Sequence, residues 1–410
     1  MYQVVVTHKI TKEYLLSIVE NIAKANNISD WEHSVTEFER IGQNYFGELF
    51  PINLSGKVNG EERRTLPMVL KLAPLDEKFR VSGAITAMFN REVFVYSELL
   101  DKYKELQRNF KPELQYVIPT CYYVRDEYCK EVIAMENMCA AGYKCYSEKV
   151  FLDYKHVKIA LKTLAKFHAL SFILKSADRK FYHNAKKVCL PLTAETNERF
   201  LNILEDRLMK ALHKFQDTRY VQLLQDLKDY CVTYIEAVSD SANQICLCHG
   251  DIWKENILFS YENDNPVSAC FIDYQTARKC SPAYDVLYLI ASSTDSELRS
   301  KHFYDLLNVY YNVFEQILKE AGLEPKELYS RELFNEDLKI VGPACLIVAN
   351  TALWLANGLQ VEGHVRSKLV YSTEVEKARA AERYKSLIRD IIDDFVRYGY
   401  LCGCSLKLIT

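Results

Sequence analysis

The 410-residue sequence predicts an α+β fold, with a β-rich first part and a mainly helical second part. Up to Met135, short apolar runs alternate with turn-forming residues, as expected for strands. From Asp153 onward, apolar residues recur with the period of a helix. The chain is also longer than a typical single domain. We therefore expect an N-terminal helical extension at residues 1–34, a β-rich domain at 35–138 and a helical domain at 139–410.

The first part contains two predicted helices and several predicted strands. Apolar residues with helical spacing predict one helix over Ile10–Asn27 and another over Ala84–Leu106. The polar stretch Ser55–Thr65, which contains two glycines, predicts a turn. Apolar and alternating runs on either side predict strands over Val35–Ile41, Glu48–Leu54, Leu66–Leu72, Tyr116–Val124 and Val132–Met135.

The second part is predicted to be almost entirely helical. Its longest apolar stretch, Ala344–Leu359, is interrupted by Asn350 and Asn357 and is too short to span a bilayer, so we interpret it as a buried helix. His168 lies on an apolar helix face, which favours a core histidine with a hydrogen-bond partner. The helical pattern covers Tyr154–Leu174, Glu195–Val238, Val286–Gly322, Leu333–Leu359 and Thr373–Tyr398.

Composition narrows the classes of partner and compartment. The 52 basic and 55 acidic residues give a net charge of −3, which argues against nucleic acid or an anionic membrane as the main partner. The 13 cysteines are odd in number and scattered, as expected for reduced thiols in a cytoplasmic protein. The N-terminus lacks the apolar core of a signal peptide. The oligomeric state is left open.

The most informative segment runs from Cys248 to Asp285. Asp251 is followed five positions later by Asn256, which is the spacing of the catalytic loop of phosphotransferases. A predicted hairpin, with Asp273 at its tip, then returns this aspartate to the side of Asn256. An amide and a carboxylate oxygen form a typical site for Mg²⁺, whose other ligands are phosphate oxygens and waters. The alternative is that these residues only form turns.

Candidate nucleotide-binding residues lie in the β-rich part. Lys71 interrupts an apolar strand, so it is either an exposed edge residue or a functional cation. Glu92 on the following helix favours function, because a strand lysine held by a helix glutamate binds the α- and β-phosphates of ATP. Backbone N–H groups of Asn44 and Tyr45, in the loop 42–47, are expected over the phosphates, although a plain hairpin turn explains that loop nearly as well.

With these residues in place, the chain resembles the insect ecdysteroid kinase-like family. That family belongs to the choline-kinase and aminoglycoside-phosphotransferase branch of the two-lobed protein-kinase-like fold. The resemblance covers most of the chain, from about Val35 to beyond Trp354. Its most specific motifs are LCHGDIWKENILF and FIDYQTARKCSPAYD, and LAKFHALS and FNREVFVY agree with it.

The resemblance implies roles for individual residues. Asp251 is implied as the general base or the hydroxyl-orienting residue. The other implied catalytic residues are Lys71, which would contact the α- and β-phosphates, and Glu92, which would hold Lys71. Implied Mg²⁺ ligands are Asn256 and Asp273. In the linker after the last strand, the carbonyl of Glu136 and the N–H of Met138 would bind the adenine edge, although Glu136 also has an interpretation as a mere strand end.

Supporting roles are implied for His249 and Asp285, which would hold the catalytic loop. Asp285 also has an interpretation as the N-cap of the helix that starts at Val286. One departure from protein kinases is Trp253, which occupies the position of a lysine that stabilises the transferred phosphoryl group. Lys254 follows it.

The sequence therefore predicts an ATP- and Mg²⁺-dependent kinase that phosphorylates a hydroxyl of a small molecule. Asp285 lies only twelve positions after Asp273, so no long peptide-docking segment fits between them. The resemblance implies an ecdysteroid or a similar apolar alcohol as acceptor. Two alternatives remain open: a kinase for choline, ethanolamine, a sugar or a xenobiotic, and a catalytically inactive binding protein.

Overall fold

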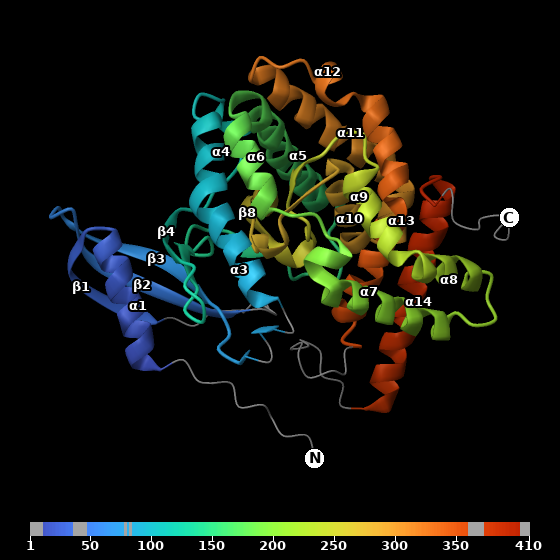
Figure 1. Cartoon of the computed structure of the whole chain (residues 1–410), viewed down its shortest axis with the longest axis horizontal. Helices are drawn as coiled ribbons and strands as arrows, with labels where there is room; N and C mark the ends of the chain where they lie inside the picture. Colours follow the sequence, from blue (N-terminus) through green and yellow to red (C-terminus); the bar gives the residue numbers. More distant parts are fainter. Residues whose placement is uncertain (1–10, 36–46, 78–79, 82–83, 360–372, 402–410) are drawn as a thin grey trace. The chain divides into compact units, whose positions relative to one another are not determined.

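The computed structural model describes residues 11–35, 47–77, 80–81, 84–359 and 373–401. The chain forms two compact units (Figure 1). Unit 1 contains Met1–Asp101 and Ile118–Lys144, and unit 2 contains Lys102–Val117 and Cys145–Thr410. The domain limits expected from the sequence stay a prediction, and each unit is described by itself.

Unit 1 is built on a five-stranded antiparallel sheet with the strand order β1-β2-β3-β5-β4. Helix α1 packs on this sheet and buries Ile18, Val19 and Ile22 against strand residues such as Ile52 and Leu70. The bounds of the elements are α1 Lys12–Ala25, β1 Ile28–Val35, β2 Glu48–Val58, β3 Arg63–Leu72, α3 Ile85–Phe94, β4 Cys121–Arg125 and β5 Val132–Glu136.

Two differences from the sequence prediction concern the start of unit 1. Residues 28–35 form strand β1, although residues 1–34 were expected to be helical. Helix α1 ends before Asn27, whose left-handed φ of 53° turns the chain back, so that Ile28 pairs with Val58. The predicted turn Ser55–Thr65 is also shorter, because β2 continues to Val58 and β3 starts at Arg63. The strand predicted after Val35 lies outside the described residues.

The helix predicted over Ala84–Leu106 is present but is not uniform. Helix α3 passes into a π-helical segment, Val95–Leu99, and then into α4, Leu100–Leu106. The hydroxyl of Ser97 donates to the carbonyl of Val93 at 2.8 Å, which competes with the regular helix ladder. The strand predicted from Tyr116 starts only at Cys121.

Unit 2 is mainly helical, as the sequence predicts (Figure 1). Its long helices are α5 Tyr154–Ala177, α7 Ala194–Lys214, α11 Ser296–Glu320, α13 Arg331–Ala356 and α14 Glu374–Arg397. The shorter ones are α6 Arg179–Val188, α8 Val221–Asp229, α9 Cys231–Asp240, α10 Pro282–Ser293 and α12 Pro325–Tyr329. Its short strands are β7 Cys246–Cys248, β8 Ile257–Glu262, β9 Asn265–Phe271 and β10 Arg278–Cys280, and β6 Lys144–Cys145 lies beside β8.

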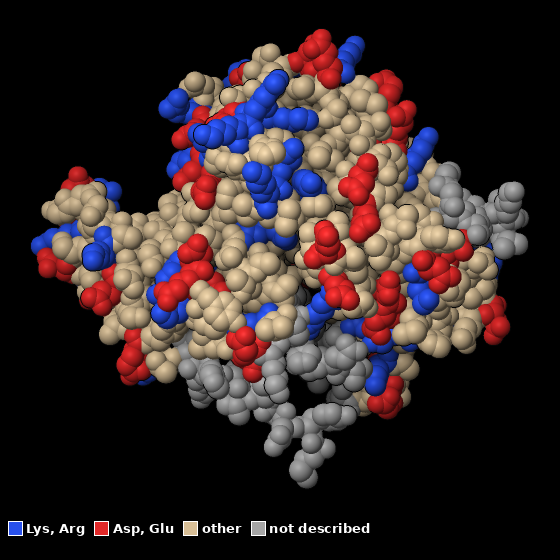
Figure 2. Space-filling model, in the orientation of Figure 1, with Lys and Arg blue, Asp and Glu red and all other residues tan. Residues whose placement is uncertain are grey.

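Helix α13 forms part of the core of unit 2. Among the described residues, Pro325–Ala356 is the one stretch with the length and hydropathy of a membrane span, but 83% of its apolar window is buried inside the protein. Burial of this kind is typical of a core helix, which agrees with the interpretation of Ala344–Leu359 from the sequence. Figure 2 shows basic and acidic side chains interspersed on the visible face, in keeping with the small net charge.

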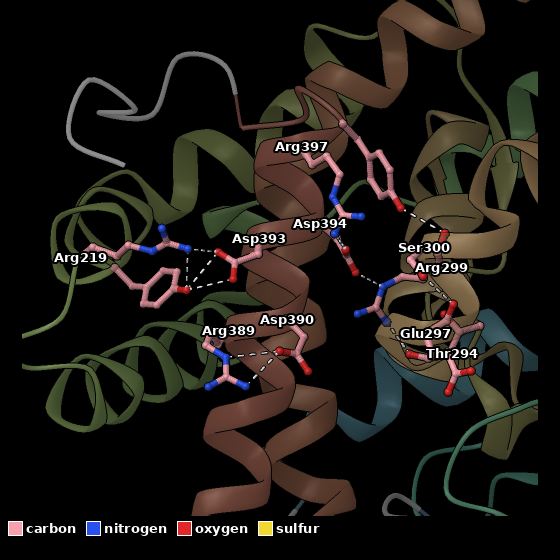
Figure 3. A network of polar contacts seen from close by, with 12 residues as sticks. Arg219, Thr294, Glu297, Arg299, Ser300, Arg389, Asp390, Asp393, Asp394 and Arg397 are labelled. Atoms are coloured by element: carbon pink, nitrogen blue, oxygen red, sulfur yellow. Dashed lines mark hydrogen bonds and ion pairs between the residues drawn. The ribbon is translucent and has the colours of Figure 1, made fainter. Parts of the chain in front are cut away.

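Buried ion pairs fasten α14 to α11 (Figure 3). The guanidinium of Arg299 on α11 donates to Asp394 at 2.6 Å and also to the carbonyl of Thr294. Arg299 is 2% exposed and Asp394 is fully buried, and Arg397 also donates to that carboxylate. The pair therefore belongs to the helical framework of unit 2 and lies outside the loop motifs identified in the sequence.

Candidate active site

Strand β3 carries Lys71 at the centre of the sheet in unit 1. Lys71 faces Leu49 of β2 and Ile133 of β5, so it is not an edge residue. Its ammonium donates to the carboxylate of Glu92 on α3, and the two side chains are 2% and 1% exposed. Burial and pairing exclude the interpretation of Lys71 as an exposed strand residue.

Gly47 explains how the chain enters β2 so close to this lysine. A Cβ at this position would lie 3.2 Å from the carbonyl oxygen of Leu72 and 3.3 Å from Cγ of Lys71. A side chain at position 47 would therefore require its neighbours to shift by a few tenths of an ångström, and glycine avoids this tight contact beside Lys71. The preceding residues Asn44 and Tyr45, expected to contact phosphate through their N–H groups, lie outside the described residues.

The two predicted adenine-binding residues lie at the end of β5. The side chain of Glu136 accepts a hydrogen bond from the backbone N–H of Thr120 at 3.0 Å, so it supports the strand end. The carbonyl of Met138 accepts from Tyr143 at 2.9 Å, which closes a turn after the strand. Recognition of adenine by the Glu136 carbonyl and the Met138 N–H remains a prediction.

In unit 2, Asp285 holds the loop that follows β7. Its carboxylate accepts from the backbone N–H of His249 at 2.7 Å and from that of Gly250 at 3.1 Å. The N-cap of α10 is Ser281, so the interpretation of Asp285 as a helix cap is wrong. A capping residue must precede the helix, whereas Pro282 already starts it and Asp285 lies in its first turn.

Two buried histidines complete this support. His168 bonds Asp285 through Nε2 at 3.1 Å and the hydroxyl of Tyr310 through Nδ1 at 2.8 Å, which confirms a core histidine with hydrogen-bond partners. Although burial alone would raise the pKa of Asp285, the hydrogen bond from His168 and the neighbouring positive charges hold this pKa below its usual value. His249 donates from Nε2 to the carbonyl of Ile272 at 3.0 Å, and burial lowers its pKa.

The loop presents Asp251 between two further hydrogen-bond donors. The hydroxyl of Tyr288 on α10 donates to Oδ1 of Asp251 at 3.0 Å, and the amide of Asn256 donates to the backbone carbonyl of Asp251 at 2.8 Å. Burial, followed by the negative charge of Asp273, raises the pKa of Asp251 to about 6. A carboxylate of raised pKa is a stronger proton acceptor than an exposed aspartate.

Backbone geometry at Gly250 fixes the direction of this aspartate. Gly250 has a φ of +84°, and a Cβ there would lie 2.2 Å from the carbonyl oxygen of Thr276. The guanidinium of Arg278 donates to the carbonyl of Gly250 at 2.9 Å. The 3₁₀ turn that ends at Thr276 and strand β10 therefore both contact the peptide that precedes Asp251.

The β8–β9 hairpin brings the two predicted metal ligands into proximity. Ile257 pairs with Phe271, and the N–H of Ile272 donates to the carbonyl of Asn256 at 3.1 Å. Asn256 and Asp273 therefore lie at the open end of the hairpin, and the turn at its tip is formed by Asn263 and Asp264, both with positive φ. The prediction that Asp273 returns to Asn256 is confirmed, but its place at the tip is wrong.

The donor set at this end of the hairpin fits a hard cation. The amide nitrogen of Asn256 is directed to Asp251, which leaves its oxygen as the atom suited to a metal. Asp273 adds a carboxylate, and its charge reaches Asp251. One amide and one carboxylate oxygen match the small number of protein ligands that Mg²⁺ takes at phosphate-binding sites.

The fold also brings to Asp251 residues that were not predicted from the sequence. Tyr288 lies three positions after Asp285 on α10, on the face of the helix that meets the loop. Arg278 lies on β10 and is 7% exposed. Helical spacing from Asp285 was the signal that would have indicated Tyr288. Lys254, which follows Trp253 in the sequence, pairs with Glu255 at 3.0 Å.

The β-rich unit with its lysine–glutamate pair and the helical unit with its aspartate–asparagine loop are the features of one class of protein. This class is the kinases with the protein-kinase-like fold. The chain belongs to the ecdysteroid kinase-like family, whose model matches residues 41–323, more than half of the sequence. This is a family of small-molecule kinases, and the predicted resemblance and fold class are confirmed. No curated protein has a significantly matching sequence.

Solved structures that resemble the chain are kinases of low sequence identity. An ethanolamine kinase of Plasmodium vivax is 15% identical with a TM-score of 0.43, over 97% of this chain and 90% of that one. A choline/ethanolamine kinase family protein of Mesorhizobium loti is 13% identical with a TM-score of 0.44, over 94% and 99%. A GDP complex of an aminoglycoside 2'-phosphotransferase is 14% identical with a TM-score of 0.43, over 95% and 100%. With TM-scores this low, they carry no argument about the acceptor.

Proposed function

We propose that the protein transfers the γ-phosphoryl group of ATP to a hydroxyl of a small molecule, with Mg²⁺ as cofactor. The observation that carries this proposal is the environment of Asp251. Its carboxylate receives a hydrogen bond from Tyr288, its loop is held by Asp285, and its pKa is raised to about 6. Such a group is suited to orient a hydroxyl and to accept its proton as the phosphoryl group is transferred.

Lys71 and Glu92 serve the nucleotide in this proposal. The ammonium of Lys71 binds the α- and β-phosphates, and Glu92 fixes its position, in keeping with their buried contact. The carbonyl of Glu136 and the N–H of Met138 bind the adenine edge, and the N–H groups of Asn44 and Tyr45 cover the phosphates.

Asn256 and Asp273 hold the metal ion, and His249 and Asp285 keep the loop in place. A Mg²⁺ ion held by Asn256 and Asp273 would supply positive charge against the phosphate groups. Asp273 then has a partner of opposite charge. The chain's own contribution is to position the hydroxyl against Asp251 and to fix the nucleotide through Lys71.

The proposed acceptor is an ecdysteroid or a similar apolar alcohol, as the name of the family suggests. Folding of the segment between Asp273 and Asp285 supports a small acceptor. Residues 274–284 form a 3₁₀ turn, strand β10 and the start of α10, so no extended peptide-docking segment is present there. The compact folding of these residues agrees with the short spacing between Asp273 and Asp285.

The test is phosphorylation of a panel of hydroxyl compounds by the purified protein with Mg-ATP, with Asp251→Asn as control. The panel contains ecdysteroids, choline, ethanolamine, sugars and plant phenolics. A steroid phosphate that the control variant does not form supports the full proposal. A product from another compound retains the kinase and replaces the acceptor, whereas a chain that binds no Mg-ATP overturns the proposal.

A further inference from the structure

A second buried ion pair of unit 1 lies outside the proposed site. The guanidinium of Arg80 donates to both carboxylate oxygens of Glu131, and the two side chains are 1% and 0% exposed. The ring of Tyr128 lies 4.5 Å from the guanidinium carbon of Arg80. Its hydroxyl in turn donates to Glu77 at 2.8 Å. This pair is therefore enclosed and oriented on several sides.

Arg80 connects three elements through its guanidinium. It donates to the carbonyl of Pro74, just after β3, at 3.0 Å, and to the hydroxyl of Thr86, in the first turn of α3, at 3.0 Å. Glu131 immediately precedes β5, and its carbonyl accepts from the N–H of Ala73 at 3.2 Å. One side chain thus joins the end of β3, the start of α3 and the start of β5.

The position of this connection relates it to Lys71 and Glu92. Glu131 is two residues from Ile133, the partner of Lys71 across the sheet, which is about 7 Å along the strand. Thr86 precedes Glu92 by six residues, about 9 Å along α3. Helix α3 is therefore attached to the sheet at two points, through Arg80 and through Glu92. A helix attached at one point can pivot, whereas two attachments fix its direction.

Stability alone does not account for a buried pair of this kind. Desolvation of two charges is costly, and replacement of such a pair by apolar residues is often neutral or stabilising. What apolar residues lack is the planar fork of donors that sets the distances to Thr86 and Pro74. The geometry is therefore the specific contribution of Arg80.

We propose that Arg80 and Glu131 are positioning residues that hold α3 in the orientation in which Glu92 presents Lys71 to the nucleotide. This inference rests on the proposed function for its effect on nucleotide binding. When the attachment at Arg80 is lost, α3 pivots and a smaller fraction of molecules has Lys71 in place. The apparent affinity for Mg-ATP falls in proportion to that fraction.

The sharpest variant is Thr86→Val, which removes the hydroxyl from α3 and leaves Arg80 and Glu131 paired. Thr86→Ser keeps the hydroxyl and is the matched control. A second test is the double variant Arg80→Met/Glu131→Leu, which removes both charges and avoids a buried unpaired group. Arg299→Met breaks a buried arginine–aspartate pair of unit 2 and serves as the control for loss of stability alone (Figure 3).

Three quantities are measured for each variant: the Kd for Mg-ATP by calorimetry, the denaturant midpoint of unfolding, and amide hydrogen exchange in α3 and in β2–β3. We expect Kd to rise about threefold in Thr86→Val and about tenfold in the double variant, with faster exchange in α3 and unchanged exchange in β2–β3. Thr86→Ser keeps the wild-type values. Arg299→Met lowers the midpoint without a change in Kd.

A double variant that binds Mg-ATP as tightly as the wild type and exchanges α3 amides at the wild-type rate would overturn the positioning role. If the wild-type chain binds no Mg-ATP, the proposed function fails, and the positioning role is then decided by exchange alone. Faster exchange confined to α3 supports it in that case, and unchanged exchange rejects it.

Discussion

The charged side chains around the two groups of candidate site residues, one in each unit, are arranged differently. In unit 1, each buried cation meets a buried carboxylate, as Lys71 meets Glu92 and Arg80 meets Glu131. In unit 2, carboxylates gather around one loop, and hydrogen bonds from backbone N–H groups, Tyr288 and His168 hold two of them. These two pairs of unit 1 are thus balanced in charge before a ligand arrives, whereas in unit 2 the negative charges of Asp251 and Asp273 act on each other.

The difference gives the charged residues of the two units different parts in the proposed phosphoryl transfer. A balanced pair fixes geometry, because neither partner can move without breaking the buried contact between the two charges. Burial and the nearby negative charge of Asp273 raise the pKa of Asp251, and the carboxylate of Asp273 provides a place for a cation. Changes in unit 1 are therefore expected to affect position and stability, and changes in unit 2 are expected to affect chemistry and metal binding.

The largest effect is expected for Asp251→Asn. The amide cannot accept the proton of the acceptor hydroxyl, so kcat falls by about 10³-fold, while the Kd for Mg-ATP changes by less than about twofold because no phosphate contact is lost. Steady-state kinetics and calorimetry measure the two quantities. Asp264→Asn, at the tip of the hairpin, is the control. Normal turnover of Asp251→Asn would refute the assignment of the base.

Lys71→Met tests the balanced pair of unit 1. Removal of the cation breaks the buried ion pair with Glu92 and is expected to cost about 3–5 kcal/mol of stability, measured by urea unfolding. The double variant Lys71→Met/Glu92→Leu should regain most of that stability without regaining affinity for Mg-ATP. Lys57→Ala removes an exposed pair with Asp30 and should leave the midpoint unchanged. Equal losses of stability in Lys71→Met and Lys57→Ala would contradict the special role of the buried pair.

Asp273→Ala tests the excess charge of unit 2. The variant should weaken binding of Mg-ATP by about 10–100-fold, since loss of even a supporting group at a metal site has an effect of this size. Folding should be little affected, in contrast to Lys71→Met. Calorimetric titrations at several Mg²⁺ concentrations measure the loss, and an affinity that does not depend on Mg²⁺ in either protein would exclude the metal site.

The smallest of these effects is expected for Tyr288→Phe. Loss of one hydrogen bond to a carboxylate corresponds to about 1.5 kcal/mol, or about a tenfold fall in kcat. Tyr284→Phe is a matched control, because Tyr284 stacks on Tyr288 but its buried hydroxyl has no hydrogen-bond partner among the described residues. If both variants lose activity equally, packing of the two rings matters and the contact with Asp251 does not.

Local patterns were enough to predict much of the fold and the core of the site. The pairing of Lys71 with Glu92, the β8–β9 hairpin and the partnered His168 all follow from period, spacing and turn chemistry. Their signals lie within single elements or in neighbouring ones. The roles of these residues in catalysis remain predictions.

Contacts between distant elements were not predictable in the same way. Tyr288 reaches Asp251 across 37 positions, and Arg80 reaches Glu131 across 51. Neither side chain stands out locally, because tyrosine on an apolar helix and arginine in a polar connection are both common. Strand β1 was missed for a related reason, since its pairing with β2 overrides a weak local preference.

Gly250 has a consequence for the genetic variation that the protein tolerates. Gly60, Gly142 and Gly250 all have positive φ, but a side chain at Gly60 or Gly142 would meet open space. Asparagine or aspartate fits such exposed left-handed turns at small cost. At position 250 any side chain would overlap Thr276, so every missense change of this codon should abolish function. The three glycines therefore differ in the substitutions that they tolerate, although all three have positive φ.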